Sequence, residues 1–423
     1  MTTAIAISGD NFEINGKPTY AEIAGGNPRA HGLLMNARFI QGIFDDKNGR
    51  ERYARFGHDV FDPEAHTDAL IAALPQWYRY GLRAFTVGIQ GGGPWYTTPN
   101  HLIENNPFGT DGRALDDAYA ARLDRLIRGA DEAGMAVIVS FFYGVQVAKL
   151  RDGKAVRNAV ETASRFLRDG GYTNVLIEVA NEYTISPFKA HPILHEPEGM
   201  AVLLELARRE SGGMPVGASG GGGIREVRRE VCEASDYVLV HGNGCTRQQY
   251  ANMIALARSY AGTKPIVCNE DSPCISRLEI GLRTHTSWGY YNNMTKQEPP
   301  ADWGITPGED TFFAHRMARA IGIEVPGIPD EHQFYLQGLE PHMVYDGKCW
   351  PRLACLYPEK VDFVEFYRND ELIDTVYDEP FHLFFRSTYE QRAWEIRPDD
   401  EHWQAVVHLC DGSIVTKHAQ AVQ

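Results

Sequence analysis

The sequence predicts a (β/α)8 barrel followed by a small antiparallel β-sandwich. Three observations support this fold class. Short apolar strands alternate with amphipathic helices from about residue 33, eight such units can be counted, and the pattern changes to short alternating strands past about residue 338. Strand–helix alternation implies a parallel sheet with crossover helices. Eight units favour a closed barrel, with an open doubly wound sheet as the alternative.

The chain opens with a predicted β-hairpin over residues 9–24. Its turn is Asn15-Gly16, and Asn-Gly between alternating residues is the strongest short hairpin signal. We expect the barrel strands at residues 34–39, 84–89, 136–142, 175–183, 215–219, 237–240, 265–271 and 287–291. Amphipathic spacing predicts helices at 63–80, 114–133, 155–167, 198–210, 247–260 and 310–321. A further helix is expected after the glycines at 220–223, ending at residue 233.

The last part of the chain has a different period. Short strands separated by turn signals are predicted at residues 361–367, 372–376, 381–385, 394–396, 403–409 and 413–416. This spacing is typical of a small antiparallel sandwich. We therefore assign residues 1–338 to the barrel with its hairpin and residues 339–423 to the sandwich.

The composition limits the partners of this chain. Its 423 residues suit a barrel of about 250 to 350 residues with an appendage. A net charge of −15 without any basic block argues against nucleic acid, because phosphate binding needs clustered Lys and Arg. A neutral sugar tolerates an acidic protein well. No run approaches the roughly 18 apolar residues of a membrane span, so no membrane association is expected.

The cysteines and the first residues bear on the compartment. Seven cysteines are an odd number, and none forms a C-x-x-C pair, which points to a reducing compartment. No basic start precedes a long apolar core, so no secretory signal is predicted. We expect a cytoplasmic protein, or a secreted one if a leader has been removed. Nothing in the sequence predicts an oligomeric state, and no metal or cofactor is expected.

Two apolar stretches end in the same dipeptide. VLIEVANEY contains Asn181-Glu182, and PIVCNED contains Asn269-Glu270. In a barrel both glutamates lie at the carboxyl ends of strands, where active sites are found. Glycoside hydrolysis needs one carboxylic acid and one ionised carboxylate. A separation of about 5 Å retains the anomeric configuration, and about 6.5–9.5 Å inverts it.

A buried cation is expected beside these carboxylates. Side chains alternate across a strand, so Glu178 and Glu182 share the face that we expect inside the barrel. A charge in that interior needs a partner. Arg38 on the first strand is the candidate, serving Glu178, Glu270 or both. The alternative is a surface arginine on a misjudged strand.

These residues resemble those of retaining glycoside hydrolases in the large (β/α)8 clan that includes cellulases and mannanases. The resemblance implies that Glu182 is the acid/base, Glu270 the nucleophile, and Asn181 a hydrogen-bond donor to the sugar 2-hydroxyl. Trp288 resembles the clan's aromatic sugar platform, and His241 matches a position that often holds His or Tyr.

The chain also departs from that clan. Asp271 follows the nucleophile where a small residue is common, and the stretch His241-Gly242-Asn243 lacks the aromatic residue that usually comes after the histidine. Both differences bear on which substrate is bound and on the exact family more than on the reaction class. The stretch VEFYRNDELIDTVYDEPF resembles the immunoglobulin-like modules that are often appended to such enzymes.

Further residues on predicted loops and strand ends suit a sugar. Sugar rings stack on aromatic side chains, and polar side chains bind the hydroxyls. We expect substrate contacts from Asn181, Arg38, Tyr143, His241, Asn243 and Trp288. Weaker candidates are Trp95, Tyr96, Tyr290, Tyr291, Trp303, Asp45, Asp46, His58 and Gln90.

The main hypothesis is a metal-free retaining β-glycosidase that acts on a β-linked oligo- or polysaccharide. One alternative is a carbohydrate-binding barrel protein without catalysis, against which the presence of both glutamates counts. A second is a lyase or aldolase, which needs a strand-end lysine or a metal cluster, and the sequence predicts neither.

Overall fold

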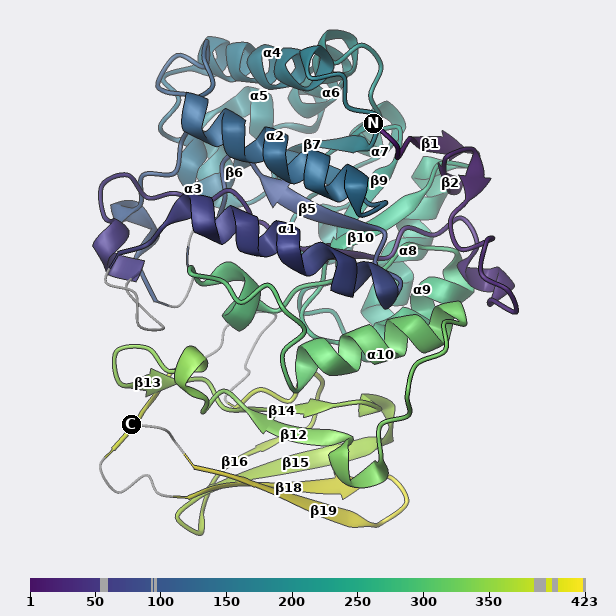
Figure 1. Ribbon diagram of the computed structural model, residues 1–423, viewed down its shortest axis with the longest axis vertical. Helices are drawn as coiled ribbons and strands as arrows, with labels where there is room; N and C mark the ends of the chain where they lie inside the picture. The colour runs from purple at the N-terminus through teal and green to yellow at the C-terminus, as the bar shows by residue number, and fades with distance from the viewer. Residues whose placement is uncertain (54–59, 93, 95–96, 384–392, 398–401, 421–423) are drawn as a thin grey trace.

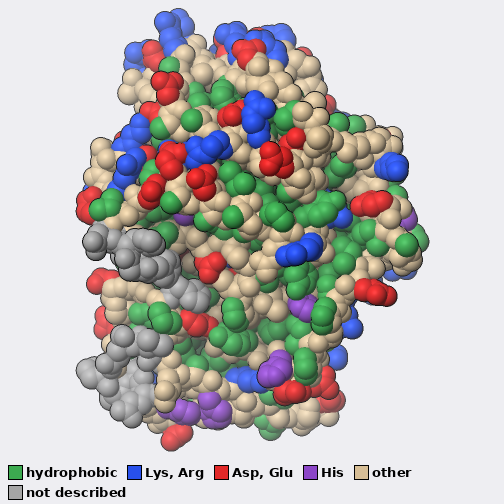
Figure 2. Space-filling model, viewed as in Figure 1, with side chains coloured by type: hydrophobic (Ala, Val, Ile, Leu, Met, Phe, Trp, Pro, Cys, Tyr) green, Lys and Arg blue, Asp and Glu red, His purple; other side chains and the backbone are tan. Residues whose placement is uncertain are grey.

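The computed structural model describes residues 1–53, 60–92, 94, 97–383, 393–397 and 402–420. Helices surround parallel strands in the larger part of the molecule, and antiparallel sheets make up the smaller part (Figure 1). On the face drawn in Figure 2, Lys and Arg side chains lie interspersed with Asp and Glu. Among the described residues, no helix combines the length and apolar character that a membrane span needs.

The parallel strands confirm the predicted alternation of strand and helix. One sheet has the strand order β11 (Gly289–Tyr290), β4 (Asn36–Arg38), β5 (Ala84–Gly88), β6 (Ala136–Tyr143), β7 (Val175–Asn181) and β8 (Val216–Gly217). A second parallel pair consists of β9 (Val238–His241) and β10 (Ile266–Glu270). Isolated parallel bridges join Ser219 to Leu239 and Val267 to Ser287. These bridges connect the pair to both edges of the six-stranded sheet.

A helix follows each parallel strand. The helices are α1 (Pro63–Arg79), α2 (Asp117–Glu132), α4 (Gly153–Asp169), α6 (Pro197–Glu210), α7 (Arg229–Ala234), α8 (Arg247–Ala261), α9 (Leu278–Thr284) and α10 (Glu309–Ile321), with short α3 (Gly144–Val147) and α5 (Pro192–His195) between them. Helix α2 begins later than predicted because the side chain of Asp116 accepts hydrogen bonds from the amides of Ala118 and Tyr119 as an N-cap.

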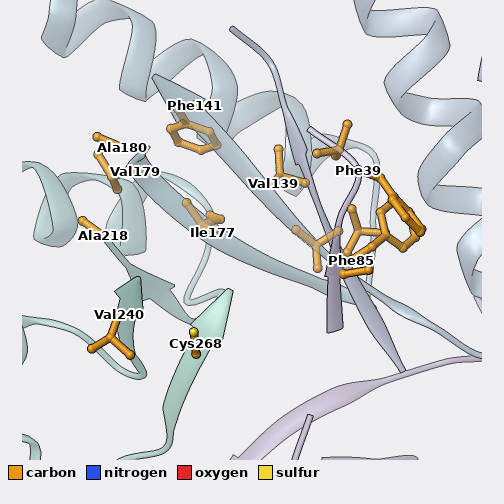
Figure 3. Packing of buried hydrophobic residues seen from close by; sticks show 14 of the residues in the cluster. Phe39, Phe85, Val139, Phe141, Ile177, Val179, Ala180, Ala218, Val240 and Cys268 are labelled. Carbon is orange, nitrogen blue, oxygen red and sulfur yellow. The ribbon is translucent and has the colours of Figure 1, made fainter. Parts of the chain in front are cut away.

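Apolar side chains between strands and helices form the main core. Figure 3 shows Phe39, Phe85, Val139, Ile177 and Val240, which lie on or next to β4, β5, β6, β7 and β9. All five are buried and belong to one cluster that includes side chains of the surrounding helices. The outward face predicted for the strand before Glu182 is therefore confirmed.

The predicted hairpin is present and gains one strand. It consists of β1 (Ile5–Ser8), β2 (Asn11–Ile14) and β3 (Lys17–Pro18). Asn15 and Gly16 have φ values of 54° and 74°, the left-handed conformation that a two-residue hairpin turn requires. Phe12 is fully buried in a cluster with residues at the N-terminal ends of the parallel strands, including Leu34, Ala84, Ala136 and Leu176. The hairpin thus covers the end of the sheet opposite to the glutamates.

The C-terminal strands are antiparallel, as predicted. A four-stranded sheet has the order β16 (Glu371–Val376), β15 (Val361–Arg368), β18 (Trp403–Leu409) and β19 (Ile414–Ala419). Two strand pairs accompany it, β12 (Phe334–Gln337) with β14 (Arg352–Cys355) and β13 (Lys348–Cys349) with β17 (Trp394–Glu395). The β15–β16 turn places Asn369 and Asp370 at positive φ, in agreement with the predicted turn.

One predicted C-terminal strand is wrong over its described part. Residues 381–383 form no strand, and residues 384–385 lie outside the described part of the chain. Phe381 has a φ of 54°, which interrupts an extended backbone, and His382 forms only an isolated bridge with Arg352.

The division of the chain at residue 338 stays a prediction. Strand β12 pairs with β14, and Leu336 packs in a second core with Leu353, Val364, Phe366 and Trp403. This strand therefore belongs with the C-terminal sheets. We refer to residues 334–420 below as the C-terminal β unit.

Candidate active site

The two glutamates sit at adjacent strand ends with different backbone conformations. Glu270 is the last residue of β10. Glu182 lies one residue past β7 and has a φ of 54°. A left-handed residue other than glycine costs on the order of 1–2 kcal/mol. The amide of Glu182 donates to Oγ of Ser219 at 3.0 Å, which holds this strained backbone in place.

The structure brings both carboxyl groups and one imidazole together. A carboxylate oxygen of Glu182, a carboxylate oxygen of Glu270 and a ring nitrogen of His241 all lie within 4.8 Å of one another. Nδ1 of His241 is 2.9 Å from Oε1 of Glu182 and 3.7 Å from Oε2 of Glu270. Residues far apart in the chain thus share one small volume at the carboxyl ends of the strands.

Glu270 is held by a fully buried cation and by an amide. Nε of Arg38 lies 2.7 Å from Oε2 of Glu270, and Nδ2 of Asn243 donates to Oε1 at 2.6 Å. Burial would lower the pKa of Arg38, but the charges of Glu270 and Glu178 outweigh it and raise the pKa above its ordinary value. Arg38 is therefore a permanent cation, and it lies inside the sheet as expected.

The two expected partners of Arg38 are bound differently. Glu270 contacts the guanidinium directly, whereas Glu178 accepts hydrogen bonds from Oγ of Ser219 at 2.7 Å and from Nδ2 of Asn269 at 3.1 Å. The charge of Glu178 still acts on the pKa of Arg38.

Asn181 is oriented by the same arginine. Nη2 of Arg38 donates to Oδ1 of Asn181 at 2.7 Å. Because the oxygen is the accepting end, the amide nitrogen of Asn181 is left as a donor. This orientation agrees with the role that the clan resemblance implies for Asn181.

His241 lies fully buried against both acids. Burial alone would lower its pKa, but the charge of Glu270 and the hydrogen bond with Glu182 outweigh burial and raise the pKa. The ring is therefore held between the two acids.

A cavity of about 320 Å³ opens onto these groups, a volume within the range of small-molecule sites. Both glutamates line it, together with hydroxyl, amide and apolar groups. The other lining residues are Tyr143, Val145, Ile185, Ser186, Pro187, Gly221, Gly222, Asn243, Ser272, Tyr291, Asn293 and Gln297. This combination suits a ligand with both hydroxyl groups and apolar faces.

The prediction that Trp288 is the aromatic sugar platform is wrong. Trp288 is fully buried, packs 5.1 Å from Phe313 and donates through Nε1 to Oδ2 of Asp271 at 3.4 Å. It precedes β11, belongs to the main core and is not part of the cavity lining. Tyr143 and Tyr291 supply the described aromatic lining instead.

The weaker aromatic candidates divide in the same way. Tyr290 is buried, stacks on Phe313 and donates to Asp310, while Trp303 packs against Phe39 in the core. Trp95 and Tyr96 lie outside the described residues.

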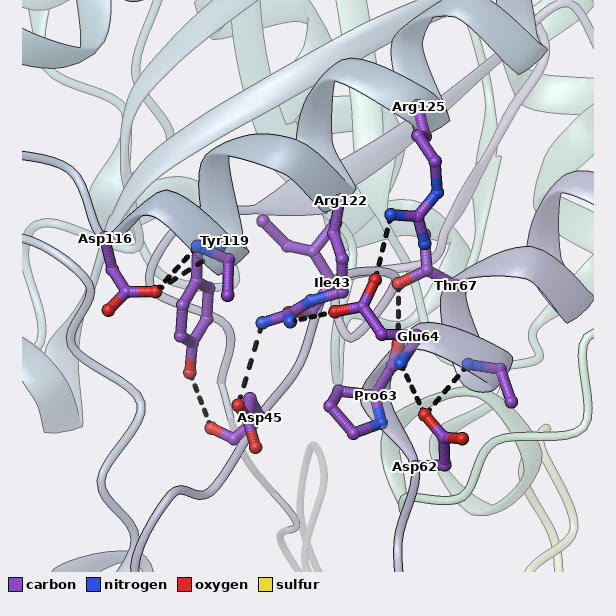
Figure 4. A network of polar contacts seen from close by, with 12 residues as sticks. Ile43, Asp45, Asp62, Pro63, Glu64, Thr67, Asp116, Tyr119, Arg122 and Arg125 are labelled. Atoms are coloured by element: carbon purple, nitrogen blue, oxygen red, sulfur yellow. Dashed lines mark hydrogen bonds and ion pairs between the residues drawn. The ribbon is translucent and has the colours of Figure 1, made fainter.

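The acidic loop candidates form structural pairs. Asp45 contacts Arg50 at 2.7 Å and Arg122 at 3.8 Å, and Asp46 accepts a hydrogen bond from the hydroxyl of Tyr53 at 2.7 Å. Figure 4 shows Arg122 between Asp45 and Glu64, so this network ties the loop after β4 to α1 and α2. Neither aspartate belongs to the cavity lining.

The remaining loop candidates include one indirect contact. Oε1 of Gln90 accepts a hydrogen bond from the amide of Tyr143 at 3.1 Å, so Gln90 supports a lining residue from behind. His58 lies outside the described part of the chain.

Sequence reasoning missed two kinds of site residue. Ser219 ends the predicted fifth strand, and that position is the signal by which it could have been found. Asn293 and Gln297 line the cavity from the π-helix η7 (Asn293–Gln297), which no sequence period indicates.

Glu182, His241 and Glu270 form a set that could also hold a metal ion. Carboxylate oxygens and an imidazole nitrogen are suitable ligands. Two features oppose this use: the permanent cation of Arg38 already neutralises Glu270, and a metal needs neutral His241, whose pKa is raised. The absence of a metal remains a prediction.

The sequence matches no family model and no curated protein. Among solved structures, the endo-1,4-β-mannanase from Eisenia fetida matches with 10% identity and a TM-score of 0.50, over 76% of this chain and 96% of that one. The β-mannanase from Mytilus edulis matches with 9% identity and a TM-score of 0.48, over 75% and 97%. The β-glucuronidase from Parabacteroides merdae matches with 10% identity and a TM-score of 0.43, over 98% of this chain and 50% of that one.

The present chain thus spans about half the length of the glucuronidase. The likeness to the Eisenia mannanase, at 10% identity, concerns the fold alone. The expected resemblance to the (β/α)8 glycoside hydrolase clan is confirmed at that level.

Proposed function

We propose that this protein is a retaining glycoside hydrolase that cleaves a β-linked oligo- or polysaccharide by double displacement. The observation that supports it best is the approach of a Glu182 oxygen and a Glu270 oxygen to within 4.8 Å. This distance fits retaining enzymes, whose carboxyl groups are about 5–5.5 Å apart, rather than inverting ones.

The surroundings of each glutamate support different roles. Glu270 is assigned as the nucleophile, because Arg38 at 2.7 Å stabilises its ionised form and Asn243 fixes its orientation. Glu182 is assigned as the acid/base, with Oε1 held by His241 and Oε2 left to protonate the leaving oxygen.

The reaction then has two steps. Glu270 attacks the anomeric carbon while Glu182 gives its proton to the departing glycosidic oxygen. Glu182 next takes a proton from water, which attacks the anomeric carbon and releases Glu270. The amide nitrogen of Asn181 is assigned to the sugar 2-hydroxyl, where a hydrogen bond strengthens in the transition state.

The proposal includes a closed (β/α)8 barrel as the scaffold. The bridges Ser219–Leu239 and Val267–Ser287 support closure, since they continue the hydrogen bonding on both sides of β9 and β10. Closure places the ends of β7 and β10 around one opening, as convergence of the two acids requires.

A panel of aryl β-glycosides with proton NMR of the first product tests this function. Hydrolysis with the β-anomer formed first is expected. An α-anomer formed first would show inversion, and equilibrium binding of sugars without turnover by any aryl glycoside would favour the non-catalytic alternative.

A further inference from the structure

Residues 291–297 form one wall of the cavity. Side chains that do not belong to the parallel strands hold this segment in place. It contributes Tyr291, Asn293 and Gln297 to the lining. Its conformation depends on Asn292, which is fully buried and whose Oδ1 accepts hydrogen bonds at 3.2 Å from the amides two and three residues ahead. Asn292 thus caps the π-helix that carries two lining residues.

Arg352 of β14, in the C-terminal β unit, reaches this cap. Its Nη2 donates to Oδ1 of Asn292 at 3.0 Å and lies 2.8 Å from Oε2 of Glu309. On its other side, Nδ2 of Asn292 donates to Oδ1 of Asp310 at 3.0 Å, and Asp310 pairs with Lys296 at 2.7 Å. All five side chains are almost completely buried.

A second contact joins the C-terminal β unit to the loop after Glu270. Glu379 accepts hydrogen bonds from the amide and the hydroxyl of Ser276, the former at 3.1 Å. The next residue, Arg277, forms an ion pair with Asp271, which directly follows Glu270. The unit therefore supports the site at two separate strand ends.

The position of Arg352 is costly for folding. Its Nε and Nη1 are buried without a hydrogen-bond partner among the described residues. Buried, unsatisfied donors destabilise a protein, and apolar replacement of buried ion pairs is often neutral or stabilising. A role in holding Asn292 accounts for a guanidinium at this place, where packing alone does not require one.

We propose that Arg352 is a positioning residue for sugar binding, and that the C-terminal β unit completes the cavity of the proposed glycosidase. By holding Asn292, Arg352 fixes the amide side chains of Asn293 and Gln297 toward the substrate hydroxyls. This inference rests on the proposed function and goes beyond it, because it assigns a substrate-positioning role to the unit that resembles an appended module.

The test compares Arg352→Met and Arg352→Lys with Arg316→Met in the full-length protein. Arg316 on α10 also joins the two parts of the molecule, through Glu359 at 3.0 Å and the carbonyl of Leu356 at 2.9 Å. Arg352→Met is expected to raise KM about tenfold with a smaller change in kcat, whereas Arg316→Met leaves KM within about twofold. Arg352→Lys should restore most of the affinity, since one ammonium can reach both acceptors.

Hydrogen exchange gives a readout that does not need activity. Peptides covering 291–297 should exchange faster in Arg352→Met but not in Arg316→Met. Asn292→Ala should reproduce both effects while leaving the Arg352–Glu309 pair in place, which keeps the test available if Arg352→Met does not fold.

The outcomes separate the two proposals. Unchanged KM and unchanged exchange in both Arg352→Met and Asn292→Ala would overturn the inference, as would equal effects of Arg316→Met. If the wild-type protein hydrolyses no glycoside, the proposed function fails, and the exchange measurement still decides whether Arg352 holds the segment.

Discussion

Ser219 connects the side chain of Glu178, within β7, to the backbone of Glu182 just past that strand. Its hydroxyl donates to Glu178 at 2.7 Å and accepts the amide hydrogen of Glu182 at 3.0 Å. One small side chain therefore bonds one oxygen of a buried carboxylate and fixes the left-handed backbone of the proposed acid/base. Such strain is common at functional sites, where surrounding structure holds it.

Replacing Ser219 by alanine should affect both stability and rate. Oε1 of Glu178 would keep only the hydrogen bond from Asn269, so a loss of about 1–3 kcal/mol in the free energy of unfolding is expected. Urea unfolding measures this loss, and kcat should fall because Glu182 is no longer fixed. Stability and kcat both equal to wild type would contradict this account of Ser219.

Removing the proposed acid/base should be reversible by an added nucleophile. Glu182→Ala should lower kcat on an aryl glycoside by about 10²–10⁴, the usual contribution of general acid–base catalysis. Azide should restore turnover and yield the β-glycosyl azide, because it attacks the glycosyl-enzyme without a base. Asn243→Ala provides a control that keeps Glu182, and azide should not rescue it.

His241 should make stability depend on pH. Its folded pKa is raised above the ordinary 6.5, so its contribution to stability is present below that pH and is lost as pH rises through the folded pKa. The stability advantage of wild type over His241→Asn should therefore shrink as the pH rises above about 6.5. Denaturant unfolding at several pH values measures the difference, and a constant or growing advantage would contradict the assigned pKa direction.

Individual site residues were predictable where a strand period defined them. Glu182 follows one apolar strand and Glu270 ends another, and alternation places Arg38 inside the sheet. The prediction that Trp288 contacts the sugar was wrong, because Trp288 lies just before the two-residue strand β11 and packs in the core. Tyr291, just past that strand, reaches the cavity instead. Asn243 was predicted by its place after β9, without any indication that it would contact Glu270.

At the scale of elements, the length of a helix or strand determines whether its apolar period can be recognised in the sequence. Helices such as α4 and α8 have several turns and were predicted to within a few residues. Helix α9 has seven residues, too few for a clear apolar period, and was missed. Among the β strands, β8 and β11 have two residues each, so only their place in the strand–helix alternation indicated them.

The start of α1 offers a test at this scale. The side chain of Asp62 accepts hydrogen bonds from the amides of Glu64 and Ala65 at 2.9 and 3.1 Å. Asp62→Ala should lower the free energy of unfolding by about 1 kcal/mol, the usual effect of losing an N-cap. Asp62→Ser keeps a capping oxygen and should lose less. Equal losses in both variants would show that the cap does not stabilise α1.

At the scale of the whole molecule, the C-terminal β unit is bound to the parallel strands through buried charges. Arg352 and Asn292 are 60 positions apart, and no local pattern in the sequence indicates their contact. By contrast, the short strands with alternating residues, separated by turn signals, indicated the antiparallel sheet of this unit. Strands β12 to β14 were missed because they are short and lie among prolines, glycines and polar residues.

Covalent trapping with an activated 2-deoxy-2-fluoro β-glycoside, followed by peptide mass spectrometry, tests whether Glu270 is the nucleophile of a retaining enzyme. The fluorine slows release of the intermediate, so a retaining enzyme becomes labelled on its nucleophile. One label per chain is expected, on Glu270, and none in Glu270→Gln. A label on another residue, or turnover of β-glycosides by Glu270→Gln at the wild-type rate, would contradict this assignment.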